Sequence, residues 1–234
     1  MSGPRVVVLT GAGISAESGL ATFRDSDGLW EGHDPMQVAT PEAYAEDPAL
    51  VQRFYDDRRA ALSRVEPNPA HHALARLEDA LGDDVLVVTQ NVDDLHERAG
   101  SRRVHHLHGS LHSAWCTACD ERHPWQGALE DRPPCPACAA PELRPDIVWF
   151  GEIPYGMDLV EDALDACELF VSIGTSGVVY PAAAFVTWAR GTTLELNLEP
   201  SAGATAFAES RRGPASELVP AWVDELLGSA GPRG

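Results

Sequence analysis

The fold is decided by the stretch Val6-Val7-Val8-Leu9-Thr10-Gly11-Ala12-Gly13-Ile14-Ser15-Ala16-Glu17-Ser18-Gly19. It begins with a short apolar run rich in β-branched residues, which is typical of a strand buried on both faces of a sheet. It then breaks into Gly-x-Gly, with Ala16 where a dinucleotide fingerprint has its third glycine. Glycine lets the backbone approach a pyrophosphate, whose charge the N-terminus of a following helix favours. The stretch therefore predicts a nucleotide site, and the alternative is an ordinary strand-to-helix turn.

One feature of a Rossmann dinucleotide site is missing. No acidic residue ends a second short strand about twenty residues further on, where such a domain holds the adenine ribose. A polar loop that contains a glycine occupies this place instead, from Thr22 to Trp30. The sequence therefore predicts a nucleotide that is held in some other way.

Length and charge limit the class of protein. A chain of 234 residues can bury one substantial core, and 44% hydrophobic with 23% charged residues is typical of a globular protein. The net charge of −19 argues against nucleic acid or an anionic membrane as main partner and suits a basic protein segment. The N-terminus has no signal-peptide pattern, and no window reaches the ~18 apolar residues of a membrane span. We expect a cytoplasmic protein, and a monomer is compatible with the sequence.

Strand and helix patterns alternate along most of the chain. Further strands are predicted at 85–89, 104–107, 169–173 and 193–200, the last of which closes the sheet and ends in polar residues. Sheet character also occurs at 147–152. Helices are predicted at 41–65 with a pause near Asp47-Pro48, and at 69–81, 157–167, 185–190 and 219–227. Polar clusters follow several strands, and open parallel sheets collect ligands at such ends. We expect an α/β fold with a Rossmann-like parallel sheet and helices on both faces.

Four of the five cysteines form two close pairs, Cys116/Cys119 and Cys135/Cys138. The spacing CxxC-x15-CxxC lies within the range of zinc sites with four thiolates. Four thiolates leave no open position for water or substrate, so the zinc is expected to be structural. Two disulfides or redox pairs are the alternative, but CxxC disulfides are strained and nothing indicates secretion. The fifth, Cys167, is expected to be a small buried hydrophobe.

A single domain is predicted over 1–234, with two insertions in one nucleotide-binding core. The Rossmann-like core is expected at approximately 1–30, 67–110 and 147–234. A helical insertion is expected at approximately 31–66, and the zinc-binding module at approximately 111–146.

Taken together, these motifs resemble the sirtuins, the NAD-dependent protein lysine deacylases, over nearly the whole chain. Six motifs occur in the order of that family: Gly11-Ala12-Gly13-Ile14-Ser15 through Phe23-Arg24, then Gln90-Asn91-Val92-Asp93, His108-Gly109, the paired CxxC motifs, Gly174-Thr175-Ser176 and Asn197-Leu198-Glu199. Any one of them could arise by chance, whereas all six together hardly could.

The resemblance implies that 11–30 forms a pyrophosphate turn and a loop that closes over NAD. Asn91 and Asp93 are then expected to order the nicotinamide end, although they could merely cap the following helix. Asn197 and Glu199 are candidates for the ribose contact that the first loop lacks. The full set of NAD-contacting residues that the resemblance implies is Gly11, Ala12, Gly13, Ser15, Glu17, Thr22, Phe23, Arg24, Trp30, Gln90, Asn91, Asp93, Gly174, Thr175, Ser176, Asn197, Leu198, Glu199 and Ala215.

The resemblance also implies a catalytic group, His108 with Asn91. The acyl-lysine carbonyl oxygen would attack the ribose C1′ as nicotinamide leaves, and His108 would act as general base on a ribose hydroxyl. An unperturbed histidine pKa near 6.5 suits this role at neutral pH. The products would be free lysine, nicotinamide and O-acyl-ADP-ribose. A solvated or capping side chain is the alternative for His108, and His71, His72, His105 and His106 are expected to be structural or solvated.

The acyl group is indicated by Tyr55 and Arg58, which lie on one face of a helix. A phenol hydroxyl and a guanidinium fork can bind a carboxylate, and Tyr-x-x-Arg resembles the sirtuin class that removes succinyl and malonyl groups. Ala39 matches a small residue that leaves this pocket room, and acetyl removal is expected to persist beside it. A surface Tyr–Arg contact is the alternative. The segment implied to pair with substrate peptide by strand addition is Val148, Trp149, Phe150, Gly151 and Glu152.

Two other classes of function share parts of this pattern. An NAD-dependent ADP-ribosyltransferase cleaves the same bond, but it leaves His108 and the pair Tyr55 and Arg58 unexplained. An NAD-sensing zinc-knuckle interaction protein would bind the cofactor tightly without releasing nicotinamide. A dehydrogenase fits least, because the ribose acid and a hydride-acceptor site are both unaccounted for.

Overall fold

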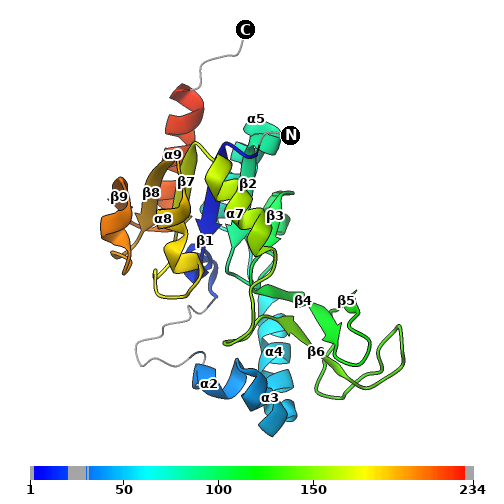
Figure 1. Ribbon diagram of the computed structural model, residues 1–234. Helices are drawn as coiled ribbons and strands as arrows, with labels where there is room; N and C mark the ends of the chain where they lie inside the picture. The colour runs from blue at the N-terminus through cyan, green and yellow to red at the C-terminus, as the bar shows by residue number, and fades with distance from the viewer. Residues whose placement is uncertain (1–2, 21–29, 31, 230–234) are drawn as a thin grey trace.

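The computed structural model describes residues 3–20, 30 and 32–229. A larger part holds a six-stranded sheet with helices on both faces, and a smaller part below it holds a three-stranded sheet beside a group of helices (Figure 1). β1 (Val6–Thr10) points with its carboxyl end toward the smaller part. The edge of the sheet at which ligands collect therefore faces the junction of the two parts.

The large sheet has the topology expected of a Rossmann-like fold. Every neighbouring pair of strands is parallel, and β1 lies at the point where the strand order reverses. In spatial order the strands are β3 (Val104–His106), β2 (Val85–Thr89), β1, β7 (Leu169–Ile173), β8 (Thr192–Asn197) and β9 (Glu209–Arg212).

The prediction that the stretch 193–200 closes the sheet is wrong, because β9 pairs outside β8. β9 has the sequence Glu-Ser-Arg-Arg and is mostly exposed, so it lacks the apolar pattern of a buried strand. Arg212 contacts the buried carboxylate of Glu195 in β8 at 2.6 Å, and the Ser210 hydroxyl donates to the same carboxylate at 3.1 Å. This edge strand is held by backbone pairing and charge rather than by apolar burial.

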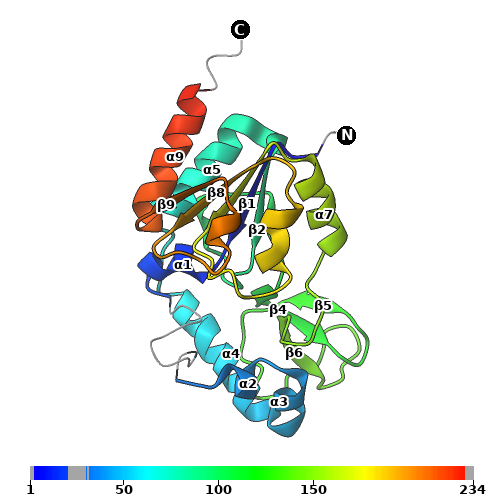
Figure 2. The same ribbon diagram turned by 60° about the vertical axis from the view of Figure 1, so that its left-hand side comes forward.

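Helices cover both faces of the large sheet (Figure 2). α5 (Pro69–Leu81) and α9 (Ala215–Ser229) pack on the face that receives Val6 and Val8. α7 (Met157–Ala166) and α8 (Phe185–Trp188) pack on the face that receives Val7 and Leu9. The alternation of side chains along β1 thus builds one apolar core on each side of the sheet.

The last helix begins at Ala215, four residues before the expected start at Val219. Its first turn is polar, and Glu17 binds it from the other end of the chain. The Ser216 N–H donates to Glu17 Oε1 at 3.0 Å, and the Ser216 hydroxyl donates to the other carboxylate oxygen. A cap supplied from so far away in the sequence has no local pattern.

The helical insertion consists of α2 (Pro35–Val38), α3 (Pro41–Glu46) and α4 (Pro48–Leu62). Each begins with proline, and each is capped by the residue before it. The side chains of Asp34, Thr40 and Asp47 accept hydrogen bonds from backbone N–H groups of the first turns. The predicted pause near Asp47-Pro48 is therefore a new helix start.

The smaller sheet is antiparallel, with β4 (Gly109–Cys116) between β5 (Arg122–Pro124) and β6 (Leu143–Ile147). Sheet character was expected at 147–152, but β6 ends at Ile147 and the next residues form a turn. Their backbone bonds leave the sheet: the Val148 N–H donates to His108 O at 2.9 Å, and the Phe150 N–H donates to Ala39 O at 2.9 Å. The segment after β6 therefore has the apolar composition of a strand, but its backbone bonds go to two loops and not to a neighbouring strand.

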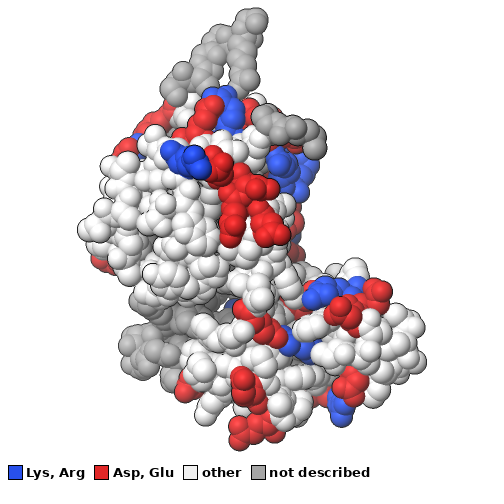
Figure 3. Space-filling view, in the orientation of Figure 1, with Lys and Arg blue, Asp and Glu red and all other residues white. Residues whose placement is uncertain are grey.

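Short helices complete the described chain. They are α1 (Ala12–Ser15), α6 (Leu95–Ala99) and the 3₁₀ turns Ala16–Ser18, Gly82–Asp84, Ala182–Ala184 and Ala204–Ala206. Among the residues that the structure describes, no helix has the length and apolarity needed to cross a membrane. Acidic side chains gather on the surface over α7 (Figure 3), where Asp158, Glu161, Asp162 and Asp165 are exposed.

Candidate active site

A cavity of about 860 Å³ lies at the carboxyl edge of the large sheet, between the two parts of the molecule. Loops that follow β1, β2, β3, β7 and β8 line it on one side, and α4 with the turn after β6 lines it on the other. The expected site residues that line it are Gly11, Ala12, Gly13, Ser15, Trp30, Ala39, Tyr55, Arg58, Gln90, Asn91, Asp93, His108, Val148, Trp149, Phe150, Gly151, Glu152, Gly174, Thr175, Ser176, Asn197, Leu198 and Glu199.

The remaining expected residues lie elsewhere. Glu17 and Ala215 do not line the cavity, and Glu17 instead binds the start of α9. Thr22, Phe23 and Arg24 lie outside the described residues. The structure therefore brings together most of the predicted site from segments far apart in the sequence.

The glycines of the first loop are required by close backbone packing. The Gly13 N–H donates to Gly174 O at 2.9 Å, and a Cβ on Gly13 would lie 2.7 Å from the Gly174 Cα. Gly174 itself has φ +62, and a Cβ there would lie 2.4 Å from the Ile14 nitrogen. The loops after β1 and β7 thus touch backbone to backbone at the switch point of the sheet. This contact leaves a narrow cradle without side chains, which suits a pyrophosphate.

Ser15, Asn91 and Asp93 form one buried hydrogen-bonded group. The Asn91 amide donates to Ser15 Oγ at 3.1 Å, and Ser15 Oγ donates to Asp93 Oδ2 at 3.0 Å. His71 Nε2 lies 3.4 Å from Ser15 Oγ, while the Asn68 N–H donates to His71 Nδ1 at 3.3 Å. Because Nδ1 accepts, the neutral ring carries its proton on Nε2 and donates to Ser15. The hydroxyl then has both acceptor positions and its proton in use.

Burial fixes the charge states of this group. It lowers the pKa of His71 to about 4, so the ring is neutral near pH 7, as the donor pattern requires. It raises the pKa of Asp93, although the Leu95 N–H and Ser15 hydroxyl oppose that shift. Together these groups hold the Asn91 amide and the Asp93 carboxylate in one orientation at the cavity wall.

His108 follows β3 and is half-buried at the cavity. Its Nδ1 lies 3.0 Å from Gln90 O, and a carbonyl oxygen can only accept. Nδ1 therefore carries the proton, and Nε2 of the neutral ring is free of one. Burial lowers the pKa of His108, and the bond to Gln90 opposes this. The side chain thus has the tautomer and charge state of a base.

Tyr55 and Arg58 line the same cavity from α4. Burial raises the pKa of Tyr55, which is 0% exposed, so its phenol keeps its proton. The Arg58 guanidinium carbon lies 4.2 Å from the ring centroid of Trp30, which also lines the cavity. The next residue, Arg59, is buried and bonded to Asp56 and to Leu111 O. One of two adjacent arginines is therefore structural, and the other faces the cavity.

The four paired cysteines converge at the tip of the smaller sheet. Cys116 Sγ lies 3.7 Å from Cys138 Sγ, Cys119 Sγ lies 3.7 Å from Cys135 Sγ, and all four sulfurs lie within 4.8 Å of one another. A tetrahedron with Zn–S bonds of about 2.3 Å separates sulfurs by roughly 3.8 Å, whereas a disulfide needs about 2.05 Å. The donor set fits a structural zinc ion and not a pair of disulfides.

Several contributors to the site were not predicted. His71 was expected to be structural or solvated, yet it completes the Ser15 group. Asn68 caps α5, and its amide also donates to Ile14 O at 2.7 Å. The signal for His71 is its place at the third helical position after Asn68, where a capping box usually has Glu or Gln.

Comparison with known proteins accounts for this arrangement. A protein named NAD-dependent protein deacylase from Caulobacter vibrioides is 56% identical over 230 residues, which cover 95% of this chain and 97% of the relative. A solved Sir2 homologue in complex with NAD has a TM-score of 0.87 and 39% identity, covering 96% of this chain and 90% of the other. A Sir2 variant with deacetylated peptide and 3′-O-acetyl ADP-ribose has a TM-score of 0.81 and 29% identity, covering 95% and 93%.

The family match covers most of the segments that build the cavity, although the lining residues 197–202 lie beyond it. A sequence model of the Sir2 family matches residues 11–181, from the first glycine loop to the segment beyond β7. These residues include the Ser15 group, His108 and the four cysteines. The chain belongs to the Sir2 family.

Proposed function

We propose that this chain is an NAD-dependent protein deacylase that removes succinyl and malonyl groups, and also acetyl groups, from lysine side chains. Family membership and the names of its relatives support the reaction. One observation carries the acyl preference: Tyr55 and Arg58 line the same cavity as His108 and the glycine loops. A protonated phenol beside a guanidinium is complementary to the terminal carboxylate of such an acyl group.

The residues of the cavity divide into two groups by their chemistry. When bound, NAD supplies the ribose that accepts the acyl group, and nicotinamide leaves. Gly11, Gly13 and Gly174 offer the backbone cradle for the pyrophosphate, and the group around Ser15 holds Asn91 and Asp93 beside it. His108 keeps its Nδ1 proton on Gln90 O and presents Nε2 to accept a proton.

The partner is a protein or peptide that carries an acylated lysine. Backbone N–H groups of Val148 and Phe150 already donate to His108 O and Ala39 O. A peptide that adds as a strand at this segment would therefore form hydrogen bonds to the segment's carbonyl oxygens and to its remaining backbone N–H groups. A cytoplasmic location is part of what we propose, since a four-thiolate zinc site requires cysteines that stay reduced.

Arg58→Met is expected to remove the preference for acidic acyl groups while acetyl removal survives. The substitution keeps much of the side-chain volume and deletes the cation that binds the carboxylate, so kcat/KM for a succinyl-lysine peptide should fall by about 100-fold, consistent with a charged hydrogen bond of ~3 kcal/mol. The assay follows peptide mass and released nicotinamide with matched succinyl and acetyl peptides. Because the chain contains no lysine, every acyl-lysine measured belongs to the added peptide.

Arg53→Met is the matched control, because Arg53 lies on α4 but pairs with Glu130 at the surface, 2.9 Å away. It should behave as the wild-type protein. Equal loss of succinyl and acetyl turnover in Arg58→Met would contradict a carboxylate receptor. Absence of nicotinamide release from either peptide in the wild-type protein would favour an NAD-sensing protein, and release without loss of acyl groups would favour an ADP-ribosyltransferase.

The pH dependence of turnover follows from His108. Its pKa lies below the ordinary value of 6.5, so the neutral base predominates at pH 7 and is lost as the pH falls through that lowered pKa. We expect kcat/KM to be level near neutrality and to decline toward acid, with a midpoint below pH 6.5. Nicotinamide release measures this, with circular dichroism at each pH to exclude unfolding. A midpoint above 6.5 would show that the ring is not the buried base described.

A further inference from the structure

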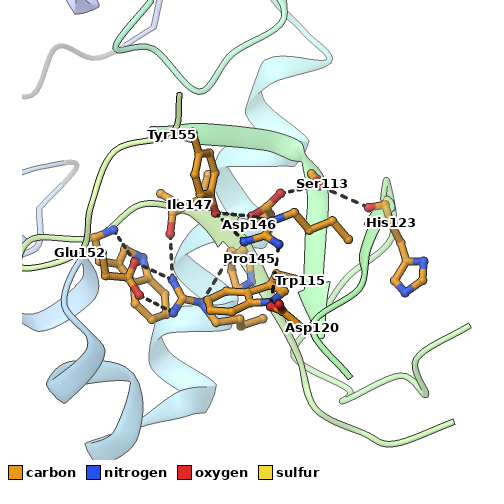
Figure 4. Close-up of polar contacts among 12 residues, drawn as sticks. Ser113, Trp115, Asp120, His123, Pro145, Asp146, Ile147, Glu152 and Tyr155 are labelled. Atoms are coloured by element: carbon orange, nitrogen blue, oxygen red, sulfur yellow. Dashed lines mark hydrogen bonds and ion pairs between the residues drawn. The ribbon is translucent and has the colours of Figure 1, made fainter. Parts of the chain in front are cut away.

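Arg144, in β6, is a buried cation that contacts the turn 148–152. Its side chain is 6% exposed, and a buried guanidinium is costly unless its donors are paired. Nη1 donates to Glu152 Oε1 at 2.8 Å and Nη2 donates to Glu152 Oε2 at 3.0 Å. Nη2 also donates to Ile147 O at 2.8 Å, and Nε donates to Pro145 O at 3.3 Å; Figure 4 shows these partners converging. The guanidinium plane is therefore fixed.

Trp149 rests on that plane. The Arg144 guanidinium carbon lies 3.4 Å from the ring centroid of Trp149, whose side chain is 2% exposed. The carboxylate of Glu152 also accepts the backbone N–H of Trp149, at 2.8 Å. One ion pair thus holds both the ring and the backbone of this tryptophan.

The indole of Trp149 in turn orients Tyr55. Its Nε1–H donates to the Tyr55 hydroxyl oxygen at 3.0 Å. This bond occupies an acceptor position on the oxygen and leaves the phenol proton as a donor. Tyr55 is fully buried in the protein, and it lines the cavity. A ligand bound in the cavity can therefore accept a hydrogen bond from the phenol. The direction of the Tyr55 hydroxyl therefore depends on where Trp149 is held.

We propose that Arg144, clamped by Glu152, is a positioning residue for acyl-group recognition. It holds Trp149, and through Trp149 it holds the Tyr55 hydroxyl, at the acyl end of the cavity. The inference rests on the proposed function and deepens it, because it assigns acyl specificity to a chain of contacts that begins outside the cavity lining.

Arg122 provides a matched comparison within the same small sheet. Both arginines lie over the ring of Trp115, each with its guanidinium carbon 4.9 Å from the centroid. Arg122, however, pairs with Asp146 at 3.3 Å and is 42% exposed. It lies over the ring of Tyr155 rather than that of Trp149. Substitution of either arginine should weaken the packing of the small sheet. Only substitution of Arg144 should displace Trp149.

The test compares Arg144→Met, Arg144→Lys, Trp149→Phe and Arg122→Met in the full-length protein. KM and kcat are measured for succinyl-lysine and acetyl-lysine peptides, with KM for NAD, zinc content and melting temperature. Arg144→Met should raise KM for the succinyl peptide by about tenfold or more, since misplacing a binding group by about 1 Å can cost up to ~100-fold. The rise should be smaller for the acetyl peptide, and KM for NAD should not change.

The other variants separate the links of the chain of contacts. Arg144→Lys keeps the charge but not the fork, so an intermediate rise in KM is expected. Trp149→Phe keeps a ring over Arg144 but deletes the indole N–H, and it should reproduce the loss for the succinyl peptide. Arg122→Met should retain the peptide KM values of the wild-type protein.

The role of Arg144 and the proposed acyl preference can be contradicted by different results. If the wild-type protein removes succinyl no better than acetyl, the preference is wrong; Arg144 is still supported if Arg144→Met, and not Arg122→Met, raises peptide KM. Equal effects of Arg144→Met and Arg122→Met would overturn the inference, as would a fall in kcat at unchanged peptide KM. If Arg144→Met does not fold, Trp149→Phe decides, and a wild-type succinyl KM in that variant overturns it.

Discussion

Replacing His108 by alanine is expected to lower kcat by roughly 10²–10⁴-fold, the usual contribution of a general base. The position of the ring proton is the reason: Nδ1 donates it to Gln90 O, which leaves Nε2 of the neutral ring without a proton. Burial keeps the ring neutral near pH 7. The measurement is single-turnover loss of acyl-lysine peptide in the presence of NAD.

Binding and folding should survive the same substitution. His108 takes no part in the backbone contact between Gly13 and Gly174, so NAD affinity by calorimetry should stay close to that of the wild-type protein. His72→Ala, at an exposed position on α5, is the control and should turn over normally. Undiminished turnover in His108→Ala would remove this residue from the mechanism. Lost NAD affinity would instead give it a binding role.

The elements that build the cavity were largely predictable, because each follows a local pattern. β1, β2 and β7 are short, largely apolar runs, and the helices α3 and α4 of the insertion begin with a capping side chain before proline. β9 was missed because its sequence is polar, and the turn 148–152 was taken for sheet because its sequence is apolar. Both errors arise where pairing with distant segments overrides local composition.

The candidate site shows the same division. Motifs predicted which residues lie near one another, but not how they are held. The glycine loop was interpreted as an approach to phosphate, whereas its first structural requirement is contact with Gly174 from a loop far along the chain. His71 and Arg144 act through neighbours that only the folded chain supplies. The place of His71 after Asn68 indicates a helix cap, but no spacing rule indicates that His71 or Arg144 positions a neighbour, since each serves one particular arrangement of side chains.

The second large effect is expected from the zinc site. Cys116→Ser should remove zinc, because a serine hydroxyl stays protonated at neutral pH and replaces one of four thiolates that lie within 4.8 Å of one another. Structural zinc contributes an apparent ~10–16 kcal/mol in isolated zinc-finger peptides, and a chain of this length loses about 2–4 °C of Tm per kcal/mol. We expect Tm to fall by more than about 10 °C, even if the zinc-binding module keeps much of its stability without the metal.

Turnover should fall together with zinc, because β4 links Cys116 to His108, and β6, whose Leu143 pairs with Cys116, leads into the turn 148–152. Metal analysis, calorimetry and the peptide assay measure the three effects on one sample. Cys167→Ser is the matched control: the same chemical change at a buried cysteine whose thiol donates to Leu164 O and which, among the described residues, lies outside the four-cysteine cluster, so the variant should keep its zinc. Full zinc occupancy and unchanged melting in Cys116→Ser would show that the four cysteines do not act as one metal site.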